Sequence, residues 1–296
     1  MRLRIGTRGS RLALAQAQEV AGLLAEAGGD PELVTMATAG DRGASPKGSP
    51  AGVKGLFVAE ISAALSRGEV DLAVHSAKDL PSEDDGGIVV AAVPERNVPY
   101  DLLVSREPEV GEGGVVGTSS LRRQALLRRF RPALEARDVR GNVDTRLRKL
   151  EEGGFDALVL AGAGLARLGI EPDHVSVLPV DEMVPAPGQG ALAVQAREGT
   201  EGADLASRLD HEPSRAAFET ERRLVALLGG GCRLPLGAYA EWRDERVRLL
   251  AVVVRPDGSD LLWAQVEAST PGEAAGEAAD ALLQAGARKI LEEAGS

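Results

Sequence analysis

Short apolar segments that alternate with helical patterns restrict the fold of this chain more than any other feature. Among the first 93 residues, the sequence predicts strands at 3–6, 33–38, 70–75 and 88–93, and helices at 12–26 and 57–66. Ser10 stands where a helix N-cap belongs, and Gly68 where a C-terminal glycine belongs. A strand–helix–strand rhythm of this kind indicates a parallel or mixed α/β sheet.

The same rhythm starts again after the segment PERNVP at residues 94–99. Further strands are predicted at 102–104, 115–117, 138–140, 157–160 and 191–196, and further helices at 121–130 and 143–151. Residues 97–100 are therefore a candidate hinge between two α/β domains.

The last part of the chain has a different pattern. A helix at 212–228 ends at three glycines, and strands at 236–242, 247–254 and 261–268 precede one long helix at 272–293. Several strands followed by a helix indicate a small α+β domain. A length of 296 residues suits two or three domains, and the change of pattern favours three.

Composition and missing motifs exclude several classes of protein. The formal net charge of −11 disfavours general attraction to nucleic acid or to an anionic membrane. The sequence has no signal-peptide pattern after Met1, and no apolar stretch approaches the ~18 residues of a transmembrane helix. Cys232 is the only cysteine, so an intrachain disulfide is impossible. These features favour the cytoplasm. Metal-ligand spacing, a Walker loop and a complete dinucleotide fingerprint are all missing, so nothing demands a metal, ATP or NAD.

Polar clusters follow several of the predicted strands. They occupy residues 7–10, 75–79, 117–123 and 140–146. In open α/β sheets, ligands bind beyond the carboxyl ends of the strands, where helix N-termini also point. Each residue alone is better explained as a helix cap, as for Ser10, Ser120 and Asn142. Repetition at several strand ends favours a shared anion site.

Arginines strengthen the prediction of an anion site. Residues 122–149 hold ten arginines and lysines against three acidic residues, a local excess of +7. Arginine binds carboxylate or phosphate bidentately, so the segment suits a polyanionic ligand. The better candidates lie near helix starts: Arg122, Arg123, Arg140 and Arg146. A solvated helix face is the alternative, and it suits Arg128, Arg129 and Arg148.

Two further positions are candidates for chemistry. Lys78 and Asp79 follow a buried strand, and they are either a surface ion pair or a carboxylate that faces a cationic reaction centre. Cys232 follows three glycines and precedes Arg233, which favours an accessible thiol with thiolate character. The alternative for this cysteine is an inert small apolar residue.

These clusters together resemble the hydroxymethylbilane synthase family, also called porphobilinogen deaminases. The matching segments run in family order from residue 3 to residue 239. They are IGTRGS at 5–10 with Leu12 and Ala13, KGLF at 54–57, DLAVHSAKD at 71–79, GTSSLRR at 117–123, RGNVDTR at 140–146, PAPGQGA at 185–191, and GGC at 230–232.

The resemblance implies a fold, a cofactor and a reaction. The fold has two hinged α/β domains like those of periplasmic binding proteins, at 1–97 with 191–208 and at 98–190, and a small α+β domain at 209–296. A dipyrromethane cofactor is implied, attached to Cys232. The implied reaction joins four porphobilinogen molecules stepwise, with loss of ammonia, into a linear tetrapyrrole for heme biosynthesis. We expect a monomer, with no nucleic-acid or membrane partner.

The resemblance also assigns residues. Asp79 matches the catalytic aspartate, whose expected role is to stabilise positive charge on a pyrrole nitrogen. The expected cofactor contacts are Cys232, Lys78, Asp79, Thr118, Ser119, Ser120, Arg122, Arg123, Arg140 and Gly141. The expected substrate contacts are Arg8, Ser10, Lys54, Arg146, Arg167 and Gln189.

The sequence departs from the family pattern in the segment RGASPKGSPAG at 42–52, a candidate lid, where Pro50 and Ala51 stand near the place of a lysine and paired glycines. Arg233 also stands where a glutamine is common. Two rival functions remain open at this point: a non-catalytic bilobal anion-binding protein, and a nucleic-acid-binding module that uses the arginines.

Overall fold

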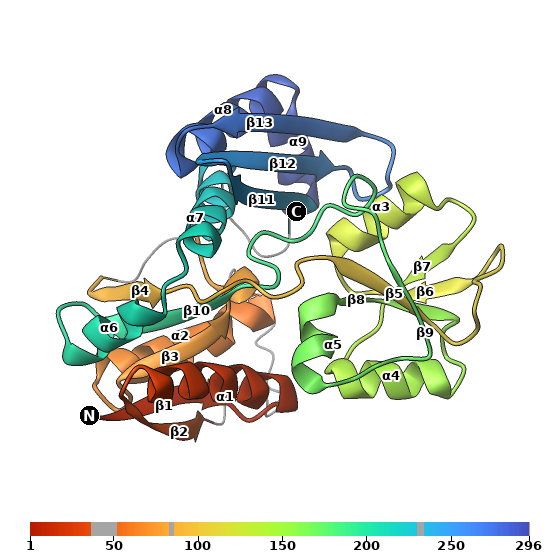
Figure 1. The fold of residues 1–296 in the computed structure, drawn as a ribbon. Helices are drawn as coiled ribbons and strands as arrows, with labels where there is room; N and C mark the ends of the chain where they lie inside the picture. The colour runs from red at the N-terminus through yellow and green to blue at the C-terminus, as the bar shows by residue number, and fades with distance from the viewer. Residues whose placement is uncertain (37–51, 83–85, 230–233, 296) are drawn as a thin grey trace.

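The computed structural model describes residues 1–36, 52–82, 86–229 and 234–295, and it contains three sheets (Figure 1). The first sheet has the strand order β2-β1-β3-β10-β4. Its strands are β1 (Arg2–Arg8), β2 (Asp30–Met36), β3 (Leu72–Ser76), β4 (Ile88–Ala92) and β10 (Leu192–Arg197), and its helices are α1 (Arg11–Glu26), α2 (Gly52–Ser66), the 3-10 turn η1 (Ala77–Asp79), α6 (Glu201–Ala206) and η2 (Ser207–Leu209). β1 is parallel to β2 and β3, whereas β10 is antiparallel to β3 and β4.

The second sheet repeats this arrangement in the order β7-β6-β8-β5-β9. Its strands are β5 (Asp101–Ser105), β6 (Val115–Gly117), β7 (Glu135–Arg137), β8 (Ala157–Ala161) and β9 (His174–Val177), with helices α3 (Leu121–Phe130), α4 (Val143–Glu151) and α5 (Gly162–Leu168). β6 is parallel to β7 and β8, and β5 is antiparallel to β8 and β9. In each sheet one antiparallel strand thus lies between three parallel strands on one side and a fourth strand of the same direction on the other.

The antiparallel strand of each sheet is the first strand after the chain has crossed from the other lobe. The first crossover, residues 93–100, leads into β5, and the second, residues 178–191, leads into β10. The two crossovers touch at Gly190, whose φ is +89°. A Cβ atom there would lie 2.4 Å from the carbonyl oxygen of Asn97, so only glycine lets them meet.

The third sheet is a meander with helices on one face. Its strands are β11 (Leu236–Arg243), β12 (Arg246–Val254) and β13 (Leu261–Ala268), all antiparallel, and its helices are α7 (Glu212–Leu227), α8 (Pro271–Gln284) and α9 (Ala287–Gly295). Four buried alanines of α8 pack against the sheet, which explains how a chain with only 3% aromatic residues fills this core. No helix among the described residues is long and apolar enough to cross a membrane.

The predicted fold class, two α/β domains and one α+β domain, is confirmed, and three details of the prediction are wrong. Residues 138–140 are not a strand, because β7 pairs with β6 three residues earlier, at Glu135–Arg137. The long last helix is two helices, because Gly286 has a φ of +101° and breaks it. The sequence analysis also missed α5, α6 and β9. We propose domain boundaries at the crossovers, giving 1–97 with 191–208, 98–190, and 209–296.

Candidate active site

Residues that follow one parallel strand of each lobe meet at one buried side chain, Gln189 on the second crossover. Its Oε1 lies 3.5 Å from Nζ of Lys78, which follows β3, and 3.4 Å from Nη2 of Arg123, which follows β6. Gln189 is fully buried. Next to it, Gly188 has a φ of +75°, and a Cβ there would lie 2.8 Å from the backbone nitrogen of Lys78. The glycines of the PAPGQGA segment therefore allow the second crossover to lie directly against the Lys78 turn.

A buried carboxylate, Asp101, holds two of the predicted arginines. Arg122 donates to it through Nη2 at 2.8 Å and Arg123 through Nη2 at 2.6 Å, and Gln189 donates through Nε2 at 2.8 Å. Burial alone would raise the pKa of Asp101, but the two arginine charges and the hydrogen bonds hold it below its usual range. Asp101 is therefore an anion in the fold, and it fixes the directions of both guanidinium groups.

The polar residues after β6 satisfy one another and cap α3. Ser120 Oγ accepts from the Arg123 backbone nitrogen at 3.4 Å, so the predicted N-cap is confirmed. Thr118 is buried and its Oγ1 accepts from the Ser120 nitrogen at 3.3 Å. Ser119 Oγ donates to the carbonyl oxygen of Val139. Ser10 likewise caps α1, whereas Asn142 makes no side-chain cap to α4. Of the three predicted caps, Ser10 and Ser120 are therefore confirmed.

Arg140 and Arg146 stand on the loop between β7 and α4. The Arg140 side chain is 90% exposed and pairs with Asp138 at 3.2 Å. Arg146 is partly buried and donates through Nε to the carbonyl oxygen of Gly141 at 2.8 Å. Burial lowers the pKa of Arg146, and the positive charge of Arg123 lowers it further. The negative charge of Asp138 opposes both effects but is the smallest of the three influences, so an added anion would stabilise the Arg146 guanidinium.

Lys78 and Asp79 form the short turn η1 at the end of β3. Both side chains are partly buried, and Arg8 reaches the same edge of the sheet from the end of β1. Arg167, expected to contact substrate, instead bonds to other residues of the protein. It donates to Glu19 of α1 at 2.7 and 3.2 Å and to the carbonyl oxygen of Gly190 at 3.1 Å. In this arrangement Arg167 joins the two lobes beside the second crossover.

Three of the sequence-based expectations fall wholly or partly outside the described residues. Cys232 and Arg233 lie outside them, as do residues 42–51 of the candidate lid. Lys54 lies in α2, but its side chain is outside the described part. The arginines assigned to a solvated face, Arg128, Arg129 and Arg148, are indeed exposed.

Sequence reasoning missed two buried carboxylates that organise the site. Asp101 is one, and Glu221 on α7 is the other. Glu221 accepts from Arg96 at 2.8 and 3.2 Å, from the Gly188 nitrogen at 2.6 Å, and from the Ala240 nitrogen at 2.7 Å. Burial raises the pKa of Glu221, against the opposing effect of the Arg96 charge. Glu221 thus ties both crossovers to the third domain, and no local sequence pattern marks either acid.

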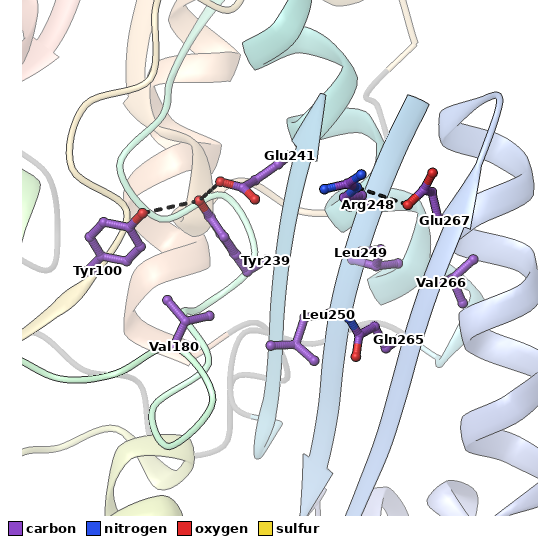
Figure 2. A pocket seen from close by; sticks show the side chains of 10 residues that line it. All are labelled: Tyr100, Val180, Tyr239, Glu241, Arg248, Leu249, Leu250, Gln265, Val266 and Glu267. Carbon is purple, nitrogen blue, oxygen red and sulfur yellow. Dashed lines mark hydrogen bonds and ion pairs between the residues drawn. The ribbon is translucent and has the colours of Figure 1, made fainter. Parts of the chain in front are cut away.

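A cavity of about 620 Å³ lies elsewhere, between the third sheet and the crossovers (Figure 2). Tyr100 and Val180 face Tyr239 and Leu250 across it. The Tyr239 hydroxyl donates to Glu241 at 2.6 Å, and Arg248 pairs with Glu267 at 2.9 Å. Its two carboxylates outnumber its one arginine, so this cavity does not suit an anionic ligand.

The fold and the site together define a two-lobed α/β protein with buried arginines beside the crossovers that join the lobes. Comparison with known proteins identifies the group. The family described as "Porphobilinogen deaminase, dipyromethane cofactor binding domain" matches residues 3–204, and its C-terminal domain matches residues 216–285. The chain belongs to the porphobilinogen deaminase family, and its first two lobes form that family's dipyrromethane-cofactor-binding domain.

Curated relatives are similar along almost their whole length. Porphobilinogen deaminase of Thiobacillus denitrificans is 45% identical, covering 98% of this chain and 98% of its own. That of Desulforudis audaxviator is 46% identical over 97% and 96%. A probable porphobilinogen deaminase of Methanosarcina mazei is 43% identical over 98% and 94%. Among solved structures, lipoprotein Tp32 of Treponema pallidum aligns with 70% of this chain and 90% of its own, at 14% identity and a TM-score of 0.43.

The residues at the site fit a dipyrromethane, which carries several carboxylates. The Nε atoms of Arg122 and Arg123 are buried and find no hydrogen-bond partner among the described residues. Buried donors of this kind are rare in a protein interior and call for an acceptor. Arg140 and Arg146 add positive charge on the loop between β7 and α4. Arginine and carboxylate are matched in shape and charge, so the donor set agrees with such a cofactor.

Proposed function

We propose that this chain is a transferase that condenses four molecules of porphobilinogen, one at a time and with loss of ammonia, into the linear tetrapyrrole hydroxymethylbilane. The observation that carries the proposal is the buried pair Arg122 and Arg123 beside the crossovers, whose Nε atoms have no hydrogen-bond partner among the described residues. Each pyrrole of substrate and product carries an acetate and a propionate, so a growing chain needs such a site. Family membership adds the reaction itself.

We propose roles for the site residues from the family resemblance together with their positions in the fold. Arg123, Arg140 and Arg146 bind carboxylates, with Gly141 and the Thr118–Ser120 loop beside them. From the first lobe, Lys78 and Arg8 bind carboxylates, together with Ser10 and Lys54. Arg122 contributes through its ion pair with Asp101. When bound through Cys232, the cofactor supplies the pyrrole end that is extended. Gln189 couples the lobes, and Arg167 reaches substrate when its pair with Glu19 opens. Asp79 stabilises positive charge on the reacting pyrrole.

The experiment that tests the function is a mass balance with purified protein and porphobilinogen. We expect one ammonia released for each porphobilinogen consumed, and a linear tetrapyrrole as the released product. Porphobilinogen binding without turnover would instead support the rival function, a non-catalytic anion-binding protein. Retention on heparin that competes with porphobilinogen would favour the nucleic-acid-binding rival, against which the net charge of −11 speaks.

Cytoplasmic location and a monomeric state are part of the proposal. A reducing compartment keeps the Cys232 thiol free for attachment of the cofactor. One chain contains both lobes and the third domain, so the site needs no residue from a second copy. We propose no nucleic-acid or membrane partner for this protein.

Arg140 offers a clean test of the carboxylate contacts, because its exposed side chain contributes little to the core. We expect Arg140→Leu to weaken cofactor loading or porphobilinogen binding by about 10-fold to 100-fold, as the loss of a charged hydrogen bond of ~1.5–3 kcal/mol implies. The measurements are cofactor occupancy by intact mass and KM for porphobilinogen. The matched control is Arg128→Leu, whose side chain is also exposed and bonds only to the Pro256 carbonyl among the described contacts. Equal effects of the two variants would refute the assignment.

A further inference from the structure

An ion pair joins the two lobes beside the second crossover, between Arg167 of α5 and Glu19 of α1. Arg167 donates to Glu19 twice, from Nε to Oε2 at 2.7 Å and from Nη2 to Oε1 at 3.2 Å. This is the two-point geometry that a planar guanidinium group makes with a carboxylate. The Arg167 side chain is 4% exposed, whereas that of Glu19 is 32% exposed. The cation of the pair is therefore buried, and solvent reaches its carboxylate.

Both members of the pair lie at the edge of the candidate site. Arg167 also donates through Nη1 at 3.1 Å to the carbonyl oxygen of Gly190, next to the buried glutamine where the lobes meet. One turn of α1 before Glu19, the Gln16 side chain donates to the hydroxyl of Ser76 at 2.6 Å, directly before η1. Residues three apart lie on the same face of a helix, so Glu19 is on the face of α1 that meets this edge of the sheet.

The pair gives Arg167 a carboxylate partner from the protein itself. A pyrrole with acetate and propionate groups offers the same chemical group, so substrate and Glu19 are rivals for one guanidinium group. Only the molecules in which Arg167 has left Glu19 can bind a substrate carboxylate there, and the apparent affinity for substrate is reduced by that fraction.

We propose that Glu19 is an internal competitor that occupies Arg167 until a carboxylate of porphobilinogen or of the growing chain takes its place. The exchange makes and breaks no covalent bond, and it moves no proton. Glu19 thereby sets the porphobilinogen concentration at which the site fills. The inference rests on the proposed function and on the role of Arg167 in it.

The lobes stay in contact when this pair opens. α1 lies beside α5 (Figure 1), and a second set of bonds joins the start of α1 to the other lobe. Arg11 donates through Nη1 to Asp144 of α4 at 2.6 Å and through Nη2 to the carbonyl oxygen of Leu168 at 3.4 Å. Glu19 can therefore release Arg167 without separating the lobes.

Glu19→Gln tests the competition, because glutamine keeps the shape and one acceptor oxygen of the side chain and removes its charge. Addition of one porphobilinogen is measured on enzyme already loaded with cofactor, over a range of porphobilinogen concentrations. We expect the half-saturating concentration to fall about 3-fold to 10-fold, because Arg167 no longer has to leave a carboxylate. The maximum rate should stay unchanged, because the reacting atoms meet the same groups. A half-saturating concentration that stays the same or rises overturns the inference.

Asp144→Asn is the matched control. It also removes one negative charge from an ion pair between the lobes, but it leaves Arg167 with its partner. We expect it to keep the wild-type half-saturating concentration, because both side chains of the Arg11–Asp144 pair are exposed and such pairs are weak. An equal fall in both variants overturns the inference, since looser lobes or the lost charge alone would then explain the gain.

A double-mutant cycle with Arg167→Gln decides whether the effect passes through Arg167. In that background, adding Glu19→Gln should leave the half-saturating concentration unchanged, and an equal fall in both backgrounds overturns the inference. If Arg167→Gln does not fold or elongate, Arg167→Lys takes its place, because lysine keeps the charge but cannot make the two-point contact. The fall should then be smaller than in the wild-type background, and an equal fall again overturns the inference. Loaded wild-type enzyme that adds no porphobilinogen would overturn the proposed function itself.

Discussion

Replacing Asp79 with asparagine is expected to leave the protein folded and to slow elongation by ~10²–10⁴-fold, the usual contribution of a positioned acid–base group. The amide keeps the shape of the side chain and removes its charge. Loss of ammonia from porphobilinogen leaves positive charge on the pyrrole nitrogen, and a fixed carboxylate in a site screened from water stabilises that charge. Asp79 is suited to this role because it is partly buried in a turn at the end of a central strand, beside Lys78.

The measurement is single-turnover elongation on enzyme loaded with cofactor, because loading and chemistry are then separate. Asp79→Glu keeps the charge and should retain more activity than Asp79→Asn. Asp173→Asn, at an exposed position before β9, is the control for a change of one charge, and it should elongate at the wild-type rate. Near-normal elongation by loaded Asp79→Asn would leave this residue only a structural role.

Loss of Cys232 is expected to have an even larger effect, because the protein would then have no thiol to hold its cofactor. Purified wild-type protein should be heavier than its sequence by one dipyrrole unit, and the added mass should lie on the peptide that contains Cys232. Cys232→Ala should have the mass of the bare chain and almost no activity. Intact mass under denaturing conditions, followed by peptide mapping, is the measurement.

Thiol alkylation provides an independent check of the attachment. A sulfur already bound in a thioether does not react, so loaded wild-type protein should resist alkylation after unfolding. Cofactor-free protein should take up one alkyl group, because Cys232 is its only cysteine. Active enzyme whose Cys232 peptide is unmodified and fully alkylated would disprove the covalent attachment.

Local patterns were enough to predict most elements of the fold. Ser10 and Ser120 cap the helices they were expected to cap, and β13 and α3 have the predicted bounds. The strand expected at 138–140 was wrong because pairing with β6 sets the register of β7, and pairing is not a local property. The last helix was predicted too long because one glycine, at a cost of ~1 kcal/mol relative to alanine, does not by itself end a helix. Gly286 ends this one because it adopts a positive φ.

The site was less predictable than the fold. Position along the helix was enough to separate Arg122, which is 3% exposed, from Arg128, which is on the surface. It could not show what holds Arg122, because Asp101 lies 21 residues before it and meets it only through the fold. Glu221 and Arg96 are likewise joined across 125 residues. Contacts of this kind leave no periodic trace in the sequence.

The strand that each lobe receives after a crossover also affects the order in which the lobes can fold during synthesis on the ribosome. All five strands of the second sheet lie within residues 101–177, so that lobe can close as soon as they have emerged. The first sheet lacks its fourth strand, β10, until residue 197 has been synthesised. Until then β3 and β4 have no partner between them, and their unpaired backbone edges are open to association with other chains. The amino-terminal lobe is thus the first to begin synthesis, but it is completed only after the second lobe.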